Sequence, residues 1–212
     1  MDQPQVDLVS AALPLFGRLG FEGASTRALA SAAGRPMSAI TYHFGGKHGL
    51  YLACADHIRD RIGGFVAATI EQQEQSGPPS PAQARAQLEQ LFKVITGAML
   101  QDTEDMARFM MREQQEPTEA FDRIWSGIMG RVLERMTTLV TVVAGDRLAP
   151  LAVRVRVMTL MGQMMVFRVA HAAVLRLTGW THIGPAEVAV VQSAVRDNLA
   201  HILDGLSGKG KP

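Results

Sequence analysis

The sequence predicts an all-α protein in which a short N-terminal unit of three helices precedes a longer helical bundle. Apolar residues recur at spacings of three and four along most of the 212 residues, as at Val6, Val9, Leu13 and Phe16. The sequence contains no strand-like alternation of useful length and no internal repeat. Hydrophobic residues make up 47% of the chain, which is enough for a sizeable core. We therefore expect one or two domains built only from helices.

The first expected helix covers residues 5–19. Its apolar stripe ends at Gly17 and Gly20, after which Phe21 can pack back on the helix. Pro14 lies inside this segment, where it removes a backbone donor and crowds the preceding turn. We therefore expect either a kink at Pro14 or a helix that begins later in the chain.

Two short helices separated by a glycine turn follow. The second helix is expected from Thr26 to Ala33, with a hydroxyl of Ser25 or Thr26 as its cap. Gly34 supplies the turn, and the third helix covers residues 36–44, because proline is tolerated in a first helical turn. This arrangement is typical of the helix-turn-helix, whose second helix enters the major groove of DNA.

The pattern remains helical to the end of the chain. A fourth helix is expected at 47–75, and the clearest break is SGPPSP at 76–81. Further helices are expected at 82–101, 103–115, 118–143, 150–178 and 186–205. We predict a helix-turn-helix domain at 1–52 with the linker helix 47–75, a second domain at 76–206, and a disordered tail at 207–212.

The distribution of charge supports a DNA-facing surface. The formal net charge is only +1, but no acidic residue occurs between Glu22 and Asp56. The same interval holds Arg27, Arg35, Lys47, His43 and His48. A surface that contacts phosphates needs a local basic patch of this kind. The alternative is a chance cluster on a polar surface.

Several other classes of protein are disfavoured. The single cysteine, Cys54, cannot form an intramolecular disulfide, and the N-terminus lacks the pattern of a signal peptide. The most apolar segment, 157–177, contains Arg168 and Arg176, so we do not interpret it as a membrane span. We expect a cytoplasmic protein in which Cys54 is a small buried residue rather than a redox sensor.

The sequence offers little support for catalysis. It contains no phosphate-binding glycine loop, no zinc-ligand spacing and no nucleophile elbow. Its six histidines are scattered without pairing at a spacing of four. We therefore expect no catalytic residue, no metal ion and no cofactor, and we predict that the protein is not an enzyme.

Two stretches resemble a known family. The stretch STRALASAAGRPMSAITYHFGGKHGLY resembles the DNA-binding domain of TetR-type bacterial repressors, and the resemblance covers about residues 8–55. Its most specific parts are the Ala-Gly turn, the triplet Tyr42-His43-Phe44 and Lys47. The stretch MMREQQEPTEAF at 110–121 resembles the effector domain of a subgroup that includes the regulator CecR.

The resemblance implies a homodimer of about nine helices per chain. On this resemblance, three N-terminal helices are expected to bind a double-stranded DNA operator, the fourth to link, and the rest to form a chamber for a small-molecule effector. The last two long helices are expected to make the dimer interface. Together with Arg27 of the basic patch, the DNA contacts implied are Thr26, Arg35, Pro36, Met37, Ser38, Thr41, Tyr42, His43 and Lys47.

The side chains of these residues suit different contacts. Thr26, Tyr42, His43 and Lys47 can bond phosphates and fix register. Arg35 and Ser38 can reach base edges, and Thr41 suits either role. Pro36 and Met37 are poor donors, so the operator is expected to be distinguished partly by thymine methyl groups or by DNA shape.

The C-terminal half is rich in methionine, which adapts to irregular cavities. The alternative for each methionine is ordinary core packing. We predict an effector site for an apolar or aromatic molecule, lined by Phe109, Met110, Glu113, Phe121, Trp125, Met129, Met161, Met165, Arg168 and His171. Arg168 and His171 share one helix face with Met164. Arg168 could pair with Glu113, face the dimer seam or bind an anionic effector, because an unpaired charge in an apolar stripe is costly.

These observations favour a transcriptional repressor that an effector releases from a palindromic operator. The alternative is a small-molecule-binding or enzymatic helical protein whose helix-turn-helix is vestigial, since Pro36 and Met37 begin the third helix. An activator, or a repressor without an effector, fits the sequence as well.

Overall fold

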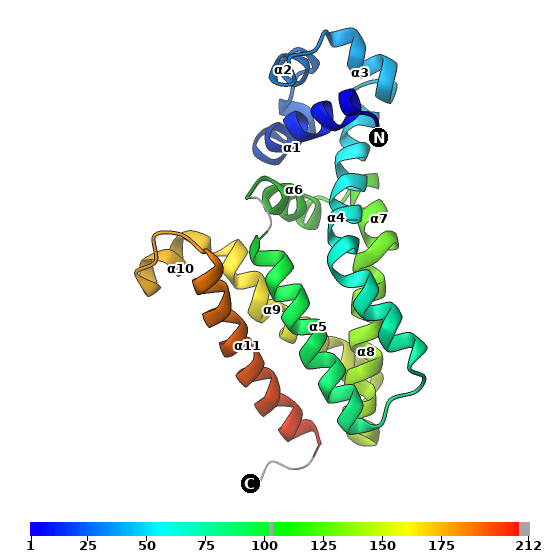
Figure 1. The fold of residues 1–212 in the computed structure, drawn as a ribbon, viewed down its shortest axis with the longest axis vertical. Helices are drawn as coiled ribbons and strands as arrows, with labels where there is room; N and C mark the ends of the chain where they lie inside the picture. The colour runs from blue at the N-terminus through cyan, green and yellow to red at the C-terminus, as the bar shows by residue number, and fades with distance from the viewer. Residues whose placement is uncertain (102–103, 208–212) are drawn as a thin grey trace. The chain divides into compact units, whose positions relative to one another are not determined.

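The computed structural model describes residues 1–101 and 104–207, so the expected tail at 207–212 lies almost entirely outside the described residues. The prediction of an all-α fold is confirmed, since these residues form helices and no strand (Figure 1). The α-helices are α1 (Gln3–Gly23), α2 (Thr26–Ala32), α3 (Met37–Phe44), α4 (Lys47–Gln75), α5 (Pro81–Gln101), α6 (Glu104–Gln115), α7 (Glu119–Ile124), α8 (Gly130–Ala144), α9 (Pro150–Val169), α10 (His171–Thr178) and α11 (Pro185–Leu206).

The chain forms two compact units. Unit 1 consists of Met1–Gly63 and the described part of Asp102–Met129, and unit 2 consists of Gly64–Gln101 and the described part of Gly130–Pro212. Helices α6 and α7 therefore belong to the same compact unit as the helix-turn-helix, although the sequence places them after the break at 76–81. The domain limits 1–52 and 76–206 remain a prediction.

Helix α1 begins earlier than residue 5, because Asp2 caps it. The Asp2 carboxylate accepts from the Gln5 backbone N–H at 2.9 Å, and the Gln5 side chain accepts from the Asp2 N–H at 2.9 Å. The helix continues through Pro14, and the non-helical backbone inside it lies at Gly20, with φ 73° and ψ 178°. The expectation of a later start is therefore wrong, and glycine absorbs the change of direction.

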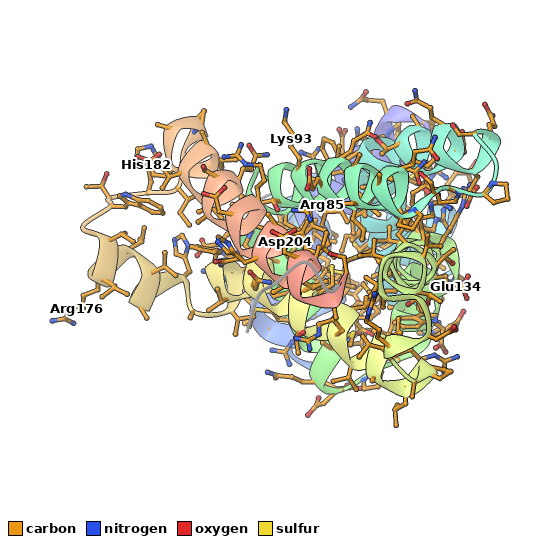
Figure 2. All side chains as sticks on the ribbon, turned by 90° about the horizontal axis from the view of Figure 1, so that it is seen from below. Arg85, Lys93, Glu134, Arg176, His182 and Asp204 are labelled. Atoms are coloured by element: carbon orange, nitrogen blue, oxygen red, sulfur yellow. The ribbon has the colours of Figure 1, made fainter. Side chains whose placement is uncertain are left out.

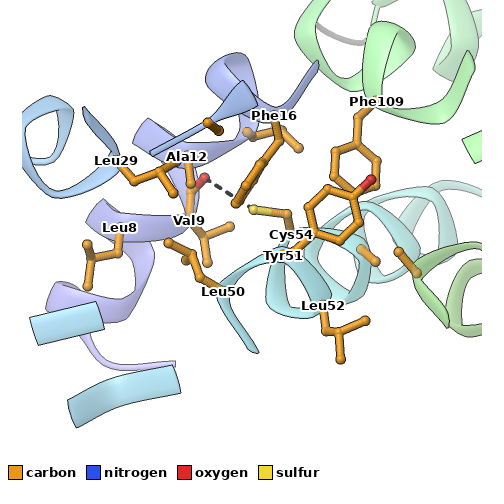
Figure 3. Packing of buried hydrophobic residues seen from close by; sticks show 14 of the residues in the cluster. Leu8, Val9, Ala12, Phe16, Leu29, Leu50, Tyr51, Leu52, Cys54 and Phe109 are labelled. Carbon is orange, nitrogen blue, oxygen red and sulfur yellow. Dashed lines mark hydrogen bonds between the residues drawn. The ribbon is translucent and has the colours of Figure 1, made fainter. Parts of the chain in front are cut away.

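The core of unit 1 brings together segments far apart in sequence. Phe16 of α1, Tyr51 of α4 and Phe109 of α6 are buried side by side, with the rings of Phe16 and Tyr51 edge to face at 4.8 Å (Figure 3). Cys54 is fully buried there, its thiol 3.9 Å from the carbonyl oxygen of Val9, and burial raises its pKa. This environment favours a thiol over the reactive thiolate, in line with a structural cysteine.

Unit 2 is built around α5, which packs against α8, α9 and α11 (Figure 1). Arg85 of α5 holds the last helix, because its guanidinium donates to the carboxylate of Asp204 and to the carbonyl oxygen of Ala200 (Figure 2). Arg135 of α8 donates to the side chain and the carbonyl oxygen of Gln73 at 3.2 and 3.3 Å. Hydrogen bonds from Arg85 and Arg135 therefore supplement the apolar core of unit 2.

Two of the expected helices are divided. The segment 118–143 consists of α7, a π-helical turn at Trp125–Met129 and α8. In that turn a Cβ atom on Gly127 would lie 2.2 Å from the Cδ atom of Arg59, so glycine makes room for the arginine. The segment 150–178 breaks at Ala170 into α9 and α10.

The apolar segment in α9 and α10 does not form one long helix. Among the described residues no single helix is both long and apolar enough to span a bilayer. Helices α9 and α10 reach that length and hydropathy only together, and they are bent by 81° at the break. Trp180 follows α10 and donates its backbone N–H to the Thr178 hydroxyl at 3.3 Å.

Two glycines of α4 should respond to the same substitution in opposite ways. A Cβ atom on Gly49 would lie 1.8 Å from the carbonyl oxygen of Phe44, whereas nothing lies within 4 Å of one on Gly63. We expect Gly49→Ala to lower the free energy of unfolding by at least ~1–3 kcal/mol through overpacking. Gly63→Ala should raise it by about 0.5–1 kcal/mol, because alanine favours a helix. Denaturant titration followed by circular dichroism measures both, and equal effects would contradict the tight contact at Gly49.

Candidate nucleic-acid interface

The backbone of the helix-turn-helix is held by local bonds. Ser25 is the cap of α2, since its hydroxyl accepts from the Ala28 N–H at 3.2 Å. In the turn Gly34 has φ 62°, and the Arg35 N–H donates to the carbonyl oxygen of Ala30 at 3.0 Å. Helix α3 ends at Gly45, whose φ is 72°. These local hydrogen bonds, together with the left-handed backbone at Gly34 and Gly45, fix where α3 begins and ends.

Helix α3 has one buried side and one open side. Ile40 is fully buried, whereas Tyr42 is 85% exposed and Met37 is 52% exposed. Pro36 precedes the helix as its N-cap rather than lying in its first turn. The predicted DNA contacts all reach solvent and lie on α2, the turn, α3 and the start of α4: Thr26, Arg27, Arg35, Pro36, Met37, Ser38, Thr41, Tyr42, His43 and Lys47.

Two acidic residues near the start of α1 lie beside the basic patch in the folded chain, although none occurs within its stretch of sequence. Arg35 donates to the Asp7 carboxylate at 2.7 Å, and the Nδ1 atom of His43 lies 4.0 Å from an oxygen of Asp2. The ammonium of Lys47 lies 4.3 Å from the centre of the Phe21 ring. Asp2 caps α1 and Asp7 lies within it. The sequence did not predict these contacts, because both acids are far along the chain from Arg35 and His43.

A chain of ion pairs connects α4 with α7 inside unit 1. Asp56 of α4 accepts from Arg59 at 2.6 Å and from Arg123 at 2.9 Å. Arg123 also donates to Glu119, and Glu119 lies 3.8 Å from His48. These side chains are partly exposed, so each pair contributes at most modest stability.

A buried carboxyl makes the stronger connection between the same helices. Glu113 of α6 is only 1% exposed. One of its oxygens accepts from the Thr118 N–H at 3.1 Å, the Thr118 hydroxyl at 2.9 Å and the Phe121 N–H at 3.0 Å. The other oxygen accepts from the phenol of Tyr51 in α4. Glu113 thereby satisfies the first turn of α7 and joins it to the linker helix.

The phenol of Tyr51 stays protonated in this environment. Burial raises its pKa first, and the hydrogen bond to Glu113 raises the pKa further. A protonated phenol can donate to the carboxyl, which a phenolate could not. The environment therefore favours the form of the phenol that can donate from α4 to α6.

The predicted effector-site residues fall into both units. In unit 1, Phe109 and Glu113 are buried, Phe121 stacks on the 44% exposed Trp125 at 5.8 Å, and Met110 and Met129 pack at the edge of the core. In unit 2, the partly buried residues are Met161, Met165, Arg168 and His171. Arg168 donates to the carbonyl oxygen of Met99. The effector site remains a prediction.

Unit 2 also contains a hollow that the sequence did not indicate. It lies between α5 and α11 and has a volume of about 480 Å³. Its apolar lining includes Phe92 and Val195, and its polar lining includes Lys93 and Arg196. None of the predicted effector-site residues lines it, because the methionine pattern that suggested those residues lies elsewhere.

Two family models match the sequence. The model of bacterial regulatory proteins of the tetR family matches residues 8–54. The model of the C-terminal domain of the HTH-type transcriptional dual regulator CecR matches residues 84–206.

Individual relatives agree with these matches. The HTH-type transcriptional dual regulator CecR of Shigella flexneri is 31% identical over 212 aligned residues, which cover 97% of this chain and 94% of the relative. The HTH-type transcriptional regulatory protein RaaS of Mycobacterium tuberculosis is 43% identical over 61 residues, which cover 29% of this chain and 28% of the relative.

Solved structures share the fold. AibR in complex with isovaleryl coenzyme A and operator DNA superposes with a TM-score of 0.67 at 13% identity, covering 92% of this chain and 96% of the other. FadR from Bacillus subtilis in complex with stearoyl-CoA superposes with a TM-score of 0.61 at 14% identity, with the same coverage of 92% and 96%.

The same substitution at two tyrosines tests the buried bond. Tyr51→Phe removes the donor to Glu113, so we expect the free energy of unfolding to fall by about 1–3 kcal/mol. Tyr42→Phe removes a hydroxyl from a side chain that is 85% exposed and should leave stability unchanged. Urea denaturation of both variants measures the difference. Equal stability of the two variants would show that the bond contributes nothing.

Proposed function

The chain belongs to the TetR family of bacterial regulatory proteins, and from that premise we propose that it is a cytoplasmic, homodimeric repressor that a small effector releases from a palindromic operator. The observation that carries this proposal is the open side of α3, where exposed residues gather on a helix fixed by the turn at Gly34. An enzyme with a vestigial helix-turn-helix has no need of such a surface.

The side chains divide between phosphates and bases. Tyr42 and Lys47 are suited to phosphates, because a phenol and an ammonium both donate to anionic oxygens. Ser38 and Thr41 are exposed on α3 and can reach base edges. Met37 is half-exposed at the start of α3 and offers an apolar contact for a thymine methyl.

The homodimer is supported by an apolar stripe on α9. Leu151, Val155 and Met158 are 73%, 55% and 56% exposed and follow one another at spacings of four and three. Val166 lies farther along the same helix and is 45% exposed, and Val190 of α11 is 58% exposed. Exposed apolar residues in a row mark a protein–protein interface. A dimer that reads a palindrome needs its two α3 helices about 34–36 Å apart, one turn of DNA.

The effector we propose is an apolar or aromatic molecule that binds the C-terminal helices. AibR and FadR share this fold and are seen with isovaleryl coenzyme A and stearoyl-CoA, so acyl thioesters are the first class to test. The hollow between α5 and α11 is lined by apolar Phe92 and Val195, by cationic Lys93 and Arg196 and by acidic Glu89, so it offers an apolar surface to an acyl chain and two cations, beside one carboxylate, to an anionic group. Such an effector weakens DNA binding only if it prefers a different conformation from the DNA-bound one.

The DNA-binding residues can be tested with a matched control. We expect the Tyr42→Ala, Lys47→Ala double variant to lose specific binding to a duplex from the region upstream of its own gene. Lys47→Ala alone should reduce the slope of log K against log salt by about 1, since one phosphate contact is lost. Arg176→Ala removes a positive charge from an exposed position of α10 in unit 2 and should bind normally. Fluorescence anisotropy at several salt concentrations provides the measurement, and unchanged binding by the double variant would contradict the assignment.

The dimer interface can be tested by introducing a charge. Parent protein should sediment as a dimer at micromolar concentration, and Val155→Asp should sediment as a monomer, because an unpaired buried carboxylate is costly. Ala68→Glu places a charge on an exposed position of α4 and should leave the dimer intact. Analytical ultracentrifugation distinguishes the species. A monomeric parent would rule out the proposed spacing of the two α3 helices.

A further inference from the structure

We propose that Asp7 of α1 is a specificity-determining residue, which positions Arg35 for a base edge and keeps it away from the DNA backbone. The inference rests on the proposed DNA-binding function and names a residue outside the helix-turn-helix. Its basis is the ion pair in which an oxygen of Asp7 accepts from the Nη2 atom of Arg35 at 2.7 Å.

An acid at this place needs an explanation, because it repels DNA phosphates. Asp2 has a local structural role, since it caps α1. Asp7 lies inside α1, beyond the first turn, and caps no helix end. Its second oxygen accepts from the Gln3 side chain at 2.8 Å, so the carboxylate is itself oriented. The bond from Arg35, followed by that from Gln3, lowers the pKa of Asp7 and keeps it charged.

Both partners are attached to fixed backbone. Arg35 lies in the turn, where its N–H donates to the carbonyl oxygen of Ala30 at 3.0 Å, two residues before α3 begins at Met37. Next to Asp7 on α1, Leu8 is fully buried in the core of unit 1. The distance between the two side chains is therefore set by the fold. The ion pair orders an arginine that would otherwise sample many rotamers.

The ion pair leaves most of the guanidinium available. A guanidinium has five N–H donors in a planar fork, and the described bond uses the Nη2 atom. The Arg35 side chain remains 37% exposed and the Asp7 side chain 35% exposed, so solvent and DNA can reach the pair. Guanine offers two acceptors, O6 and N7, to a correctly oriented fork. Arg35 can therefore contact a base while Asp7 holds it.

The ion pair between Asp7 and Arg35 also weakens binding to non-specific DNA. In a complex with non-specific DNA, affinity comes from the number of phosphates that cations neutralise. Arg35 is already neutralised by Asp7, so it adds little to that number. Asp7 thus favours the operator by orientation and disfavours other DNA by occupying a cation, and a contact that penalises the wrong partner is one route to specificity.

The test is Asp7→Asn, which keeps the size of the side chain and removes its charge. We expect affinity for a duplex selected by the parent from a random pool to fall several-fold, because Arg35 loses its orientation. Affinity for a scrambled duplex should rise several-fold, with a salt slope steeper by about 1, because Arg35 becomes free to bind a phosphate. Fluorescence anisotropy on both duplexes provides the ratio.

Two further variants separate position from charge. Asp60→Asn changes the net charge equally on the exposed side of α4, and it should alter both affinities by one common factor. In an Arg35→Gln background, Asp7→Asn should leave the ratio of the two affinities unchanged. If Asp7→Asn raises both affinities equally, or still changes the ratio without Arg35, the inference is wrong.

Failure of the underlying function gives a different result. A parent protein that prefers no duplex over the scrambled one contradicts the proposed function and, with it, the inference. Thermal melting monitors folding of each variant. Should Asp7→Asn unfold, Arg35→Lys supplies the test, because lysine can pair with Asp7 but lacks the fork, and it should lower the ratio while Asp60→Asn does not.

Discussion

Unit 1 depends on one buried carboxyl. Glu113 is almost fully buried, and a carboxyl in that position is costly unless every oxygen finds donors. Thr118 and Phe121 supply donors from the start of α7, and Tyr51 supplies one from α4. The start of α7, which follows Glu113 closely in the chain, and the sequence-distant helix α4 must therefore adopt their places together. Phe16 and Phe109 of the apolar core pack against the Tyr51 ring beside this polar centre.

Because of this constraint, the helix-turn-helix is not an independent unit. Its three helices do not form the compact unit alone, because α6 and α7 are fastened to α4 by the Glu113 bonds and by the Asp56 ion pairs. Helix α4 begins three residues after Phe44, the last residue of α3. A rearrangement of α6 or α7 would thus act on α4 close to α3. Coupling between an effector and DNA requires an element of this kind, with contacts that differ between two states.

Periodicity and turn residues predicted most of the fold. The bounds of α4 were predicted as observed, because the helix-breaking residues Gly45-Gly46 and SGPPSP lie at its two ends. The division of 150–178 at Ala170 was not predictable, since no glycine or proline marks it and tertiary packing decides it. The pairing of Asp7 with Arg35 and of Tyr51 with Glu113 depends on three-dimensional proximity, which spacing along one chain does not encode. The family resemblance nevertheless named side chains on α3 that the structure leaves exposed, such as Met37 and Tyr42.

The position of the two tryptophans has a practical consequence. Trp125 lies in unit 1, stacked on Phe121 directly after α7, and Trp180 lies in unit 2 between α10 and α11. The chain contains no other tryptophan. Each compact unit therefore carries its own intrinsic fluorophore, and replacing either indole with phenylalanine leaves an optical signal from the other. Emission spectra of the two single-tryptophan proteins can follow the units separately during titration or unfolding, without any attached dye.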